Sequence, residues 1–272
     1  MTLNGRTMIM SGGSRGIGLA IAKRAAQDGA NIALLAKTTE PHPKLPGTIF
    51  TAAEEIEAAG GNALPLVGDI RDDEFVEQAV AKTAAEFGGI DIVVNNASAI
   101  NLNKSEDVPM KSYDLMLDIN VRGAFLLSKT ALPHLKNGTN PHILTLSPPI
   151  RLERDRLFNF TAYTVSKFAM SVVSLNLSVE LEADGIAANS LWPRTMIDTA
   201  AVRNVIGGET LSRSRTPEIM ADAAYTILTK PASECTGNFF IDEEVLRDEG
   251  VHDFSKYLVD GTEEDLAEDF WV

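Results

Sequence analysis

A tyrosine and a lysine lie four residues apart at the start of a segment with helical spacing. Tyr163 and Lys167 would share one face of that helix, which places a phenol and an ammonium in one site. A neighbouring cation favours the ionised form of a phenol and lowers its pKa. The pair therefore predicts a side chain that exchanges protons near neutral pH, as a general acid or base.

A glycine-rich turn near the N-terminus separates the first strand-like run from the first helical one. Its spacing is G-x-x-x-G-x-G: Gly12 allows a tight exit from the strand, Gly16 lets a pyrophosphate approach the backbone, and Gly18 brings helix and strand close. Backbone N–H groups and the helix dipole would face the phosphates. The turn therefore predicts a dinucleotide site. Its other predicted cofactor contacts are Ser14, Arg15 and Ile17.

The end of the second predicted strand indicates which dinucleotide is bound. A carboxylate about 20 residues after the glycine turn would bind the ribose 2′-hydroxyl of NAD(H). Here the strand is followed by Lys37, with no carboxylate before Glu40, and Arg15 adds a cation from the turn. Two cations favour a 2′-phosphate, so the sequence predicts NADP(H), with Lys44 as a third candidate cation. A solvated surface lysine is the alternative for Lys37.

Short apolar runs alternate with longer amphipathic ones along most of the chain. This pattern predicts an α/β fold in which helices cover both faces of a parallel sheet. One catalytic domain is expected over 1–250, then an acidic tail over 251–272, and the long loops 38–50 and 195–216 are expected to bind ligand or act as lids. The predicted strands are 7–10, 31–35, 63–67, 92–94, 143–146, 186–191 and 238–241. The predicted helices are 17–29, 51–59, 73–87, 112–135, 162–184 and 217–228.

Composition limits the class of protein. The 272 residues carry 24 basic and 38 acidic side chains, a net charge of −14, which disfavours nucleic acid and anionic membranes as partners. Residues 242–272 hold 12 acidic and 2 basic side chains, which predicts a solvated, partly mobile C-terminus. The alternative is docking on a partner subunit through Phe270 and Trp271.

A single cysteine, Cys235, favours a reducing compartment such as the cytoplasm. The four histidines share no ligand spacing, so no metal site is expected.

Four motifs stand in one order along the chain: the glycine turn, the run NNAS at 95–98, Asn120, and Tyr163 with Lys167. Together they resemble the short-chain dehydrogenases/reductases, from about residue 7 to residue 241. The resemblance implies a Rossmann-type, doubly wound sheet of seven parallel strands in the order 3-2-1-4-5-6-7. More specifically, it is similar to a branch of the family whose members carry an additional sterol-carrier domain, and this chain is expected to lack that domain. The segments behind this closer likeness are 37–48, 147–149, 191–193 and 237–242.

The resemblance also implies roles for matching residues. Tyr163 transfers the substrate proton, Lys167 binds the nicotinamide ribose and assists the tyrosine, and Asn120 holds a proton-relay water. Arg194 stands where the family usually has glycine, so it is expected to face the cofactor or substrate. The further implied cofactor contacts are Asp69 and Ile70 at the adenine, Asn96 beneath the nucleotide, and Pro193, Ile197 and Thr199 at the carboxamide and pyrophosphate.

The serine that polarises the substrate carbonyl departs from the family pattern. It normally lies 13 residues before the tyrosine, which here is Ile150, whereas Ser147 lies 16 before it. Either Ser147 turns into the site as the catalytic serine or the site lacks a serine donor. Losing one such donor typically costs about 2.7–4 kcal/mol of barrier.

These residues predict an enzyme that transfers a hydride reversibly between NADP(H) and a carbonyl or secondary alcohol, with a lipophilic substrate suggested by the resemblance. A sensor or scaffold that binds NADP(H) with little or no turnover is the alternative, motivated by the departing serine. Helices 112–135 and 162–184 correspond to the family's subunit interface, so a homodimer or homotetramer is expected. Phe158, Phe160 and Trp192 are candidates for an apolar wall on the substrate side.

Overall fold

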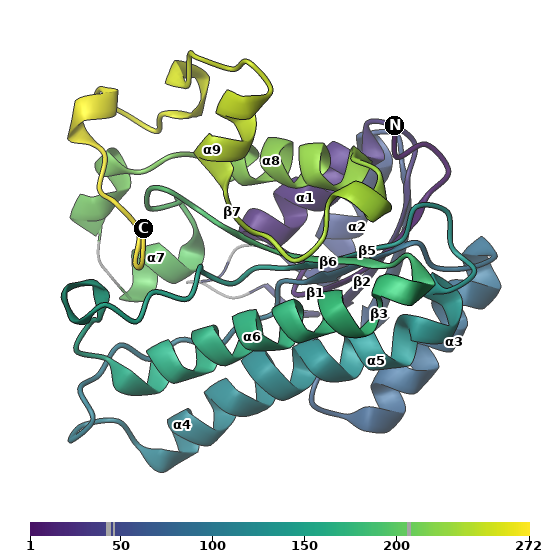
Figure 1. The fold of residues 1–272 in the computed structure, drawn as a ribbon, viewed down its shortest axis with the longest axis horizontal. Coiled ribbons are helices and arrows are strands. Elements are labelled where there is room, and N and C mark those ends of the chain that lie inside the picture. Colours follow the sequence, from purple (N-terminus) through teal and green to yellow (C-terminus); the bar gives the residue numbers. More distant parts are fainter. Residues whose placement is uncertain (42–44, 46, 206–207) are drawn as a thin grey trace.

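Seven parallel strands form one sheet in the order β3-β2-β1-β4-β5-β6-β7, with helices on both faces (Figure 1). This confirms the predicted fold and strand order. The computed structural model describes residues 1–41, 45, 47–205 and 208–272, with 208–210 described in the backbone alone. The strands are β1 Thr7–Ser11, β2 Asn31–Ala36, β3 Asn62–Val67, β4 Ile92–Asn95, β5 His142–Thr145, β6 Ala187–Trp192 and β7 Phe239–Ile241. The α-helices are α1 Gly16–Ala26, α2 Ile49–Ala58, α3 Asp73–Phe87, α4 Met110–Met116, α5 Ala124–Leu135, α6 Thr161–Glu180, α7 Ala200–Val205, α8 Glu218–Thr229 and α9 Asp242–Asp248.

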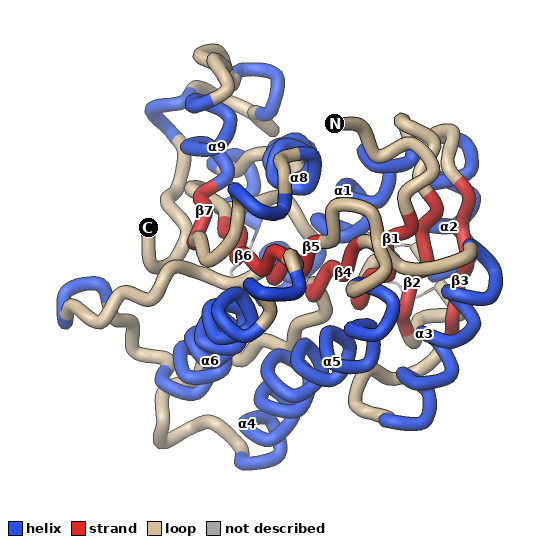
Figure 2. The backbone as a smooth tube through the Cα atoms, turned by 45° about the vertical axis from the view of Figure 1, so that its right-hand side comes forward, coloured by secondary structure: helices blue, strands red, loops and turns tan. Residues whose placement is uncertain are grey.

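Two layers of helices bury the two faces of the sheet. Helices α1, α2 and α8 lie on one face, and α3, α5 and α6 lie on the other (Figure 2). We call the apolar cluster between the sheet and α1, α2 and α8 the first core, and the cluster between the sheet and α3, α5 and α6 the second core. Met8 and Met10 of β1 belong to the first core, and Ile9 between them belongs to the second, because successive strand side chains point to opposite faces. Both faces of the strands are therefore buried, which explains why they read as continuous apolar runs.

The strand order reverses beside β1, and this reversal locates the ligand cleft. From β1 the chain builds outward to β2 and β3, then returns to place β4 on the other side of β1. In such sheets the crevice at the carboxyl ends of the two strands flanking the reversal binds ligands. The glycine turn leaves β1 at this edge, and Asn96 follows β4 at the same edge.

Close approach between these two strand exits requires glycine. Gly12 has φ +73°, and a Cβ on it would lie 2.8 Å from the Ala97 Cα. A Cβ on Gly18 would lie 2.5 Å from the Asn96 Nδ2, which donates a hydrogen bond to the Gly12 carbonyl at 2.8 Å. The turn is therefore fastened to the segment after β4 as well as to its own strand and helix.

The single helix predicted over 112–135 is interrupted by a π-helical segment. Leu117–Gly123 is π-helical and joins α4 to α5, and the fully buried Asn120 lies within it. Such segments insert a residue into a helix and are frequent at functional sites. Apolar periodicity did not reveal it because one wide turn shifts the pattern by a single residue.

The chain after β7 packs on the body of the domain. The expectation of a solvated, mobile end is wrong for its last residues, since Trp271 is 1% exposed. The alternative, docking on a partner subunit, differs from what is seen, because Trp271 packs among aromatic rings of its own chain. Burying a large aromatic side chain stabilises by a few kcal/mol, which outweighs the tendency of a charged terminus to stay in water.

Replacing Gly12 by alanine tests the close approach. Gly88 also has positive φ, but nothing lies within 4 Å of its would-be Cβ, so it is the matched control. Gly88→Ala should cost about 1–2 kcal/mol of unfolding free energy from conformation alone. Gly12→Ala should cost roughly 1–3 kcal/mol more, because its Cβ meets backbone. Urea unfolding measures both, and equal losses would contradict the packing described.

Candidate active site

Tyr163 and Lys167 lie on the buried face of α6, near its N-terminal end, and are 6% and 2% exposed. The Lys167 ammonium donates a hydrogen bond to the Leu146 carbonyl, just after β5, at 2.8 Å. It also lies 5.1 Å from the centre of the Trp192 ring. The packing of α6 on the sheet thus brings both side chains to the carboxyl edge of β5 and β6.

The electrostatics of this pair differ from the sequence prediction. Burial raises the pKa of the Tyr163 phenol well above its usual range; the Asp269 carboxylate adds to the rise, and a hydrogen bond with Ser98 opposes it. Burial lowers the pKa of Lys167 to about 7, and Asp269 opposes that change. With a pKa of about 7, Lys167 carries its positive charge on only part of the molecules at neutral pH. In this structure burial outweighs the effect of Lys167, and the pKa of Tyr163 is raised where the sequence predicts that it is lowered.

Asn120 and Ser147 are engaged with other partners. The Asn120 Oδ1 accepts from the Ala99 amide at 2.7 Å, and its Nδ2 donates to the Ala99 carbonyl and to Ser166. The fully buried Ser147 hydroxyl donates to Ser190 of β6 at 3.0 Å. Ser98 lies close enough to the Tyr163 phenol to lower its pKa, and it was not among the predicted site residues. Its signal was a polar residue just beyond the fourth strand.

The start of α1 forms the phosphate end of the cleft. Arg15 precedes the helix in extended conformation, and no side chain caps the first turn, so its N–H groups can face an anion. A cavity of about 620 Å³ opens here, lined in part by Arg15, Gly16, Thr199 and Arg203. A Cβ on Gly16 would come within 3.3 Å of the Thr199 side chain. The structure therefore brings together Gly16 and Thr199, both predicted to face the pyrophosphate.

Three charged side chains meet where the ribose of the adenosine was expected. Lys37, just after β2, pairs with Asp69 at 3.1 Å, and Arg71 pairs with the same carboxylate at 2.7 Å. The Arg71 guanidinium, with help from Lys37, holds the pKa of Asp69 well below its usual range. Sequence reasoning missed Arg71, whose signal was a basic residue two positions after Asp69. Lys44 lies outside the described residues.

The remaining predicted cofactor contacts fall into two groups. Asn96 holds the glycine turn, and Ser14 is buried within that turn. The others are apolar and pack largely into the protein: Ile17 against the first core, Ile70 against Gly123, Ile197 within the first core, and Pro193 buried after β6.

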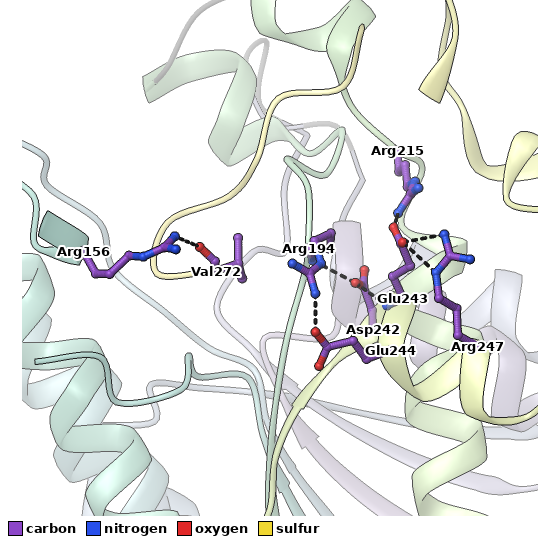
Figure 3. Close-up of polar contacts among 8 residues, drawn as sticks. All are labelled: Arg156, Arg194, Arg215, Asp242, Glu243, Glu244, Arg247 and Val272. Carbon is purple, nitrogen blue, oxygen red and sulfur yellow. Dashed lines mark hydrogen bonds and ion pairs between the residues drawn. The ribbon is translucent and has the colours of Figure 1, made fainter. Parts of the chain in front are cut away.

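Arg194 is bound to the start of α9. Its side chain pairs with Glu244 of α9, and its amide donates to the Asp242 carboxylate at 2.8 Å (Figure 3). The Arg194 side chain is thus engaged by α9, and its expected contact with cofactor or substrate stays a prediction. Two acidic residues at the start of α9 attract it, and they follow it by about 50 positions, beyond the reach of local sequence patterns.

Comparison with known proteins decides the family. Residues 6–209 match the family model described as short chain dehydrogenase. The chain belongs to the short-chain dehydrogenases/reductases. The closer likeness predicted from the sequence is also confirmed: hydroxysteroid dehydrogenase-like protein 2 from Danio rerio is 54% identical over 258 residues. That match covers 95% of this chain and 62% of the relative, so this dehydrogenase/reductase spans about three-fifths of the relative's length.

Solved structures agree with the assignment. A short chain dehydrogenase from Mycobacterium thermoresistibile is 59% identical with a TM-score of 0.93, covering 100% of this chain and 96% of its own. More distant relatives differ in cofactor. A blue fluorescent protein from a metagenomic library, 28% identical with a TM-score of 0.75 over 89% of this chain and 97% of its own, is in complex with NADPH. Carveol dehydrogenase from Mycobacterium avium, in complex with NAD, shares the fold alone at 21% identity, with a TM-score of 0.77 over 88% of this chain and 96% of its own.

The cleft of this dehydrogenase/reductase fits a nicotinamide dinucleotide. The uncapped start of α1 suits a pyrophosphate, because its first N–H groups can bind phosphate oxygens. The glycine turn holds this start in place through its close contact with residues 96–97. Lys37 and Arg71 lie at one end of this cradle, and Lys167 lies on α6 at the carboxyl edge of β5. The chain's own residues thus span the positions at which phosphate, adenosine ribose and nicotinamide ribose would be held.

Aromatic rings enclose the substrate side of the dehydrogenase/reductase site. The Trp271 ring centre lies 5.8 Å from that of Tyr163, and Phe160 lies 6.1 Å from Tyr163 on a second side. Sequence reasoning singled out part of this group but not the contribution of the C-terminus to the site. We call the group the aromatic wall; its members are Phe158, Phe160, Phe168, Trp192, Phe270 and Trp271.

Asp269→Asn should shift the pH dependence of alcohol oxidation. Burial raises the pKa of Asp269 to about 7, so above that pH its negative charge keeps the pKa of Tyr163 high. Removing the charge should lower the pKa of Tyr163, and the rise of kcat/KM with pH should move down by about one unit. The exposed Glu268→Gln is the matched control and should leave the profile in place. An unmoved profile in a folded Asp269→Asn protein would exclude this coupling.

Proposed function

We propose that this protein is an NADP(H)-dependent oxidoreductase that interconverts a carbonyl compound and a secondary alcohol. The bound nicotinamide would supply or accept the hydride. Tyr163 gives the substrate oxygen its proton in reduction and removes it in oxidation. The observation that carries the proposal is the placement of Tyr163 and Lys167 on the buried face of α6, beside the edge of the sheet at which the glycine turn opens.

Neighbouring residues support this proton transfer. Lys167 is anchored at the Leu146 carbonyl, from where its ammonium can hydrogen-bond the nicotinamide ribose. The neighbouring Ser98 side chain lowers the pKa of Tyr163, which favours proton release. Asn120 positions Ala99, next to Ser98, and its role as the holder of a relay water stays a prediction. Ser147 as the carbonyl donor would require its hydroxyl to leave Ser190.

The preference for NADP(H) rests on the charges at the adenosine ribose. Asp69 is a carboxylate of the kind that would favour NAD(H), but Lys37 and Arg71 both bond to it. The Lys37 side chain is 58% exposed, so its ammonium can turn to a phosphate with little loss of packing. Arg71 adds the planar donor pattern that suits phosphate oxygens.

A lipophilic substrate is proposed from the surroundings of Tyr163. The aromatic wall offers ring faces and edges next to the phenol, and such surfaces bind apolar groups. The charged residues 151–156 lie outside this wall and are exposed.

A second candidate is a protein that binds NADP(H) as a sensor or scaffold with weak turnover. Two observations favour it: Ser147 bonds to Ser190 rather than to Tyr163, and Tyr163 is almost fully enclosed. An enzyme remains the better proposal, because a binding protein has no need of a tyrosine and a lysine on one buried helix face.

A homodimer or homotetramer is proposed from the outer face of α6. Val165, Val172 and Val179 recur every seven residues and are 42%, 45% and 71% exposed, and Phe125 of α5 is 46% exposed. A second copy of the chain would cover this stripe. None of the described helices has the length and apolar composition to cross a bilayer. The free, buried Cys235 suits a reducing compartment, and we propose the cytoplasm.

Tyr163→Phe tests the enzymatic proposal. The substitution retains the ring and removes the proton donor, so NADPH-dependent reduction of carbonyl compounds should fall about 10²- to 10⁴-fold. Tyr113→Phe, on α4, is the matched control and should retain activity. NADPH binding, followed by cofactor fluorescence, should persist in both. Undiminished reduction by Tyr163→Phe would refute the assigned role, and binding without turnover in the native protein would favour the sensor.

Lys37→Asp tests the cofactor preference. A carboxylate at this position repels a 2′-phosphate and accepts a ribose hydroxyl, so the ratio of kcat/KM for NADPH over NADH should fall at least about fivefold. Lys136, which pairs with Asp184 at 2.8 Å, provides a matched exposed lysine, and Lys136→Asp should leave the ratio unchanged. An unchanged ratio for Lys37→Asp would remove Lys37 from the 2′-phosphate site.

A further inference from the structure

The last five residues of the chain return to the catalytic tyrosine. The Asp269 amide donates to the Arg194 carbonyl at 3.0 Å, and Glu268 pairs with Thr195 as an isolated β-bridge. Figure 1 shows this C-terminal end coming back from beyond α9 toward the α6 side of the molecule. A segment more than 100 residues from Tyr163 in sequence thus forms part of its surroundings.

Two further hydrogen bonds hold the end of this segment. The Trp192 indole donates to the Phe270 carbonyl at 2.9 Å. The Arg156 guanidinium donates to the Val272 oxygen at 2.7 Å (Figure 3). Trp192 ends β6, and Arg156 lies in the loop before α6. Trp271 is therefore held between two elements that border the site.

The Trp271 ring lies at the centre of the aromatic wall. Its ring centre is 5.8 Å from Tyr163, 5.7 Å from Trp192, 5.4 Å from Phe168 and 6.0 Å from Phe160. The side chain is 1% exposed. It therefore occupies space directly beside the phenol that would transfer the substrate proton.

The backbone conformation and the buried indole N–H of Trp271 are both energetically unfavourable. Its φ of +65° lies in the left-handed region, which a bulky residue adopts only when its surroundings require it. Its indole N–H is buried and, within the described residues, has no hydrogen-bond partner. Backbone strain that packing maintains at a site is a reason to ask what the residue does there.

We propose that Trp271 is the specificity-determining residue of the reductase site: its ring forms the boundary that limits the size of the carbonyl compound reaching Tyr163. This inference rests on the proposed function and names the part of the chain that selects the substrate. Because the phenol is almost fully enclosed while the indole is in place, we expect larger fused-ring ketones to reach it only when that ring is removed. The unpaired indole N–H offers a donor to a polar group of the substrate.

Substrate selectivity tests the proposal. Reduction of cyclohexanone and of the bicyclic 1-decalone, each with NADPH, is compared in the native protein, in Trp271→Ala and in a variant that ends at Ala267. Both changes should raise the ratio of kcat/KM for decalone over cyclohexanone at least tenfold, because both open the same space. Trp271→Phe retains a ring and should change the ratio by less than Trp271→Ala.

Phe254→Ala provides the matched control. Phe254 is a fully buried aromatic residue of the same C-terminal region, but it packs in the first core with Tyr257, away from Tyr163. Its loss should lower the unfolding midpoint and leave the decalone-to-cyclohexanone ratio within twofold. A similar change of ratio in this control would show a general effect of core damage and would overturn the inference.

The remaining outcomes are also decisive. An unchanged ratio in both active Trp271 variants overturns the inference and leaves the proposed function intact. Equal loss of turnover on both ketones, with NADPH binding and the unfolding midpoint preserved, also overturns it, because the wall would then serve catalysis and not selection. If no ketone is reduced by the native protein, the proposed function fails first, and the two failures are thereby distinguished.

Discussion

The hydrogen bond from the Lys167 ammonium to the Leu146 carbonyl ties the chemistry of the site to the fold. Leu146 follows β5, and Lys167 lies on the helix that packs across that strand, so the bond sets how α6 sits on the sheet edge. It holds the Lys167 side chain where water has little access. The same burial that fixes the lysine in place lowers its pKa to about 7. The position of the Lys167 side chain and its pKa therefore have one common cause, which is its burial between α6 and the sheet.

Two further carboxyl groups share this enclosed region. Burial raises the pKa of Asp242 and of Asp269 to about 7 each. The Asp242 carboxylate adds to the rise at Asp269, and the Glu243 carboxylate adds to the rise at Asp242. Asp269 is brought there by the C-terminal segment, and Asp242 by the start of α9. With Lys167, they form a set of groups whose protonation changes near neutral pH. The protonation state of the site therefore depends on how the end of the chain is seated, because that seating excludes water.

A rigid cofactor side contrasts with a substrate side built from distant segments. The glycine turn is fixed by contacts with residues 96–97, which directly follow β4, the neighbour of β1 in the sheet. The aromatic wall instead combines the loop before α6, the end of β6 and the C-terminus. One fold can thus retain its cofactor chemistry while exchanging the residues that select the substrate.

The sequence alone determined the parts of this protein that depend on local patterns. Alternating apolar and amphipathic runs placed all seven strands, and the glycine spacing located the turn at the first strand exit. Tyr163 and Lys167 were found because helical periodicity relates residues four apart without knowledge of the fold. The family resemblance added the strand order, which the sheet confirms.

Tertiary structure decided what depends on contacts between distant segments. Arg194 pairs with Glu244 of α9, Ser147 bonds to Ser190, and the Trp271 ring packs beside Tyr163. In each case the partner lies more than 40 residues away along the chain. The pKa values of Tyr163 and Lys167 belong to the same class, because desolvation depends on every element that closes over them. No spacing rule encodes such burial, since it arises only once the whole chain has packed.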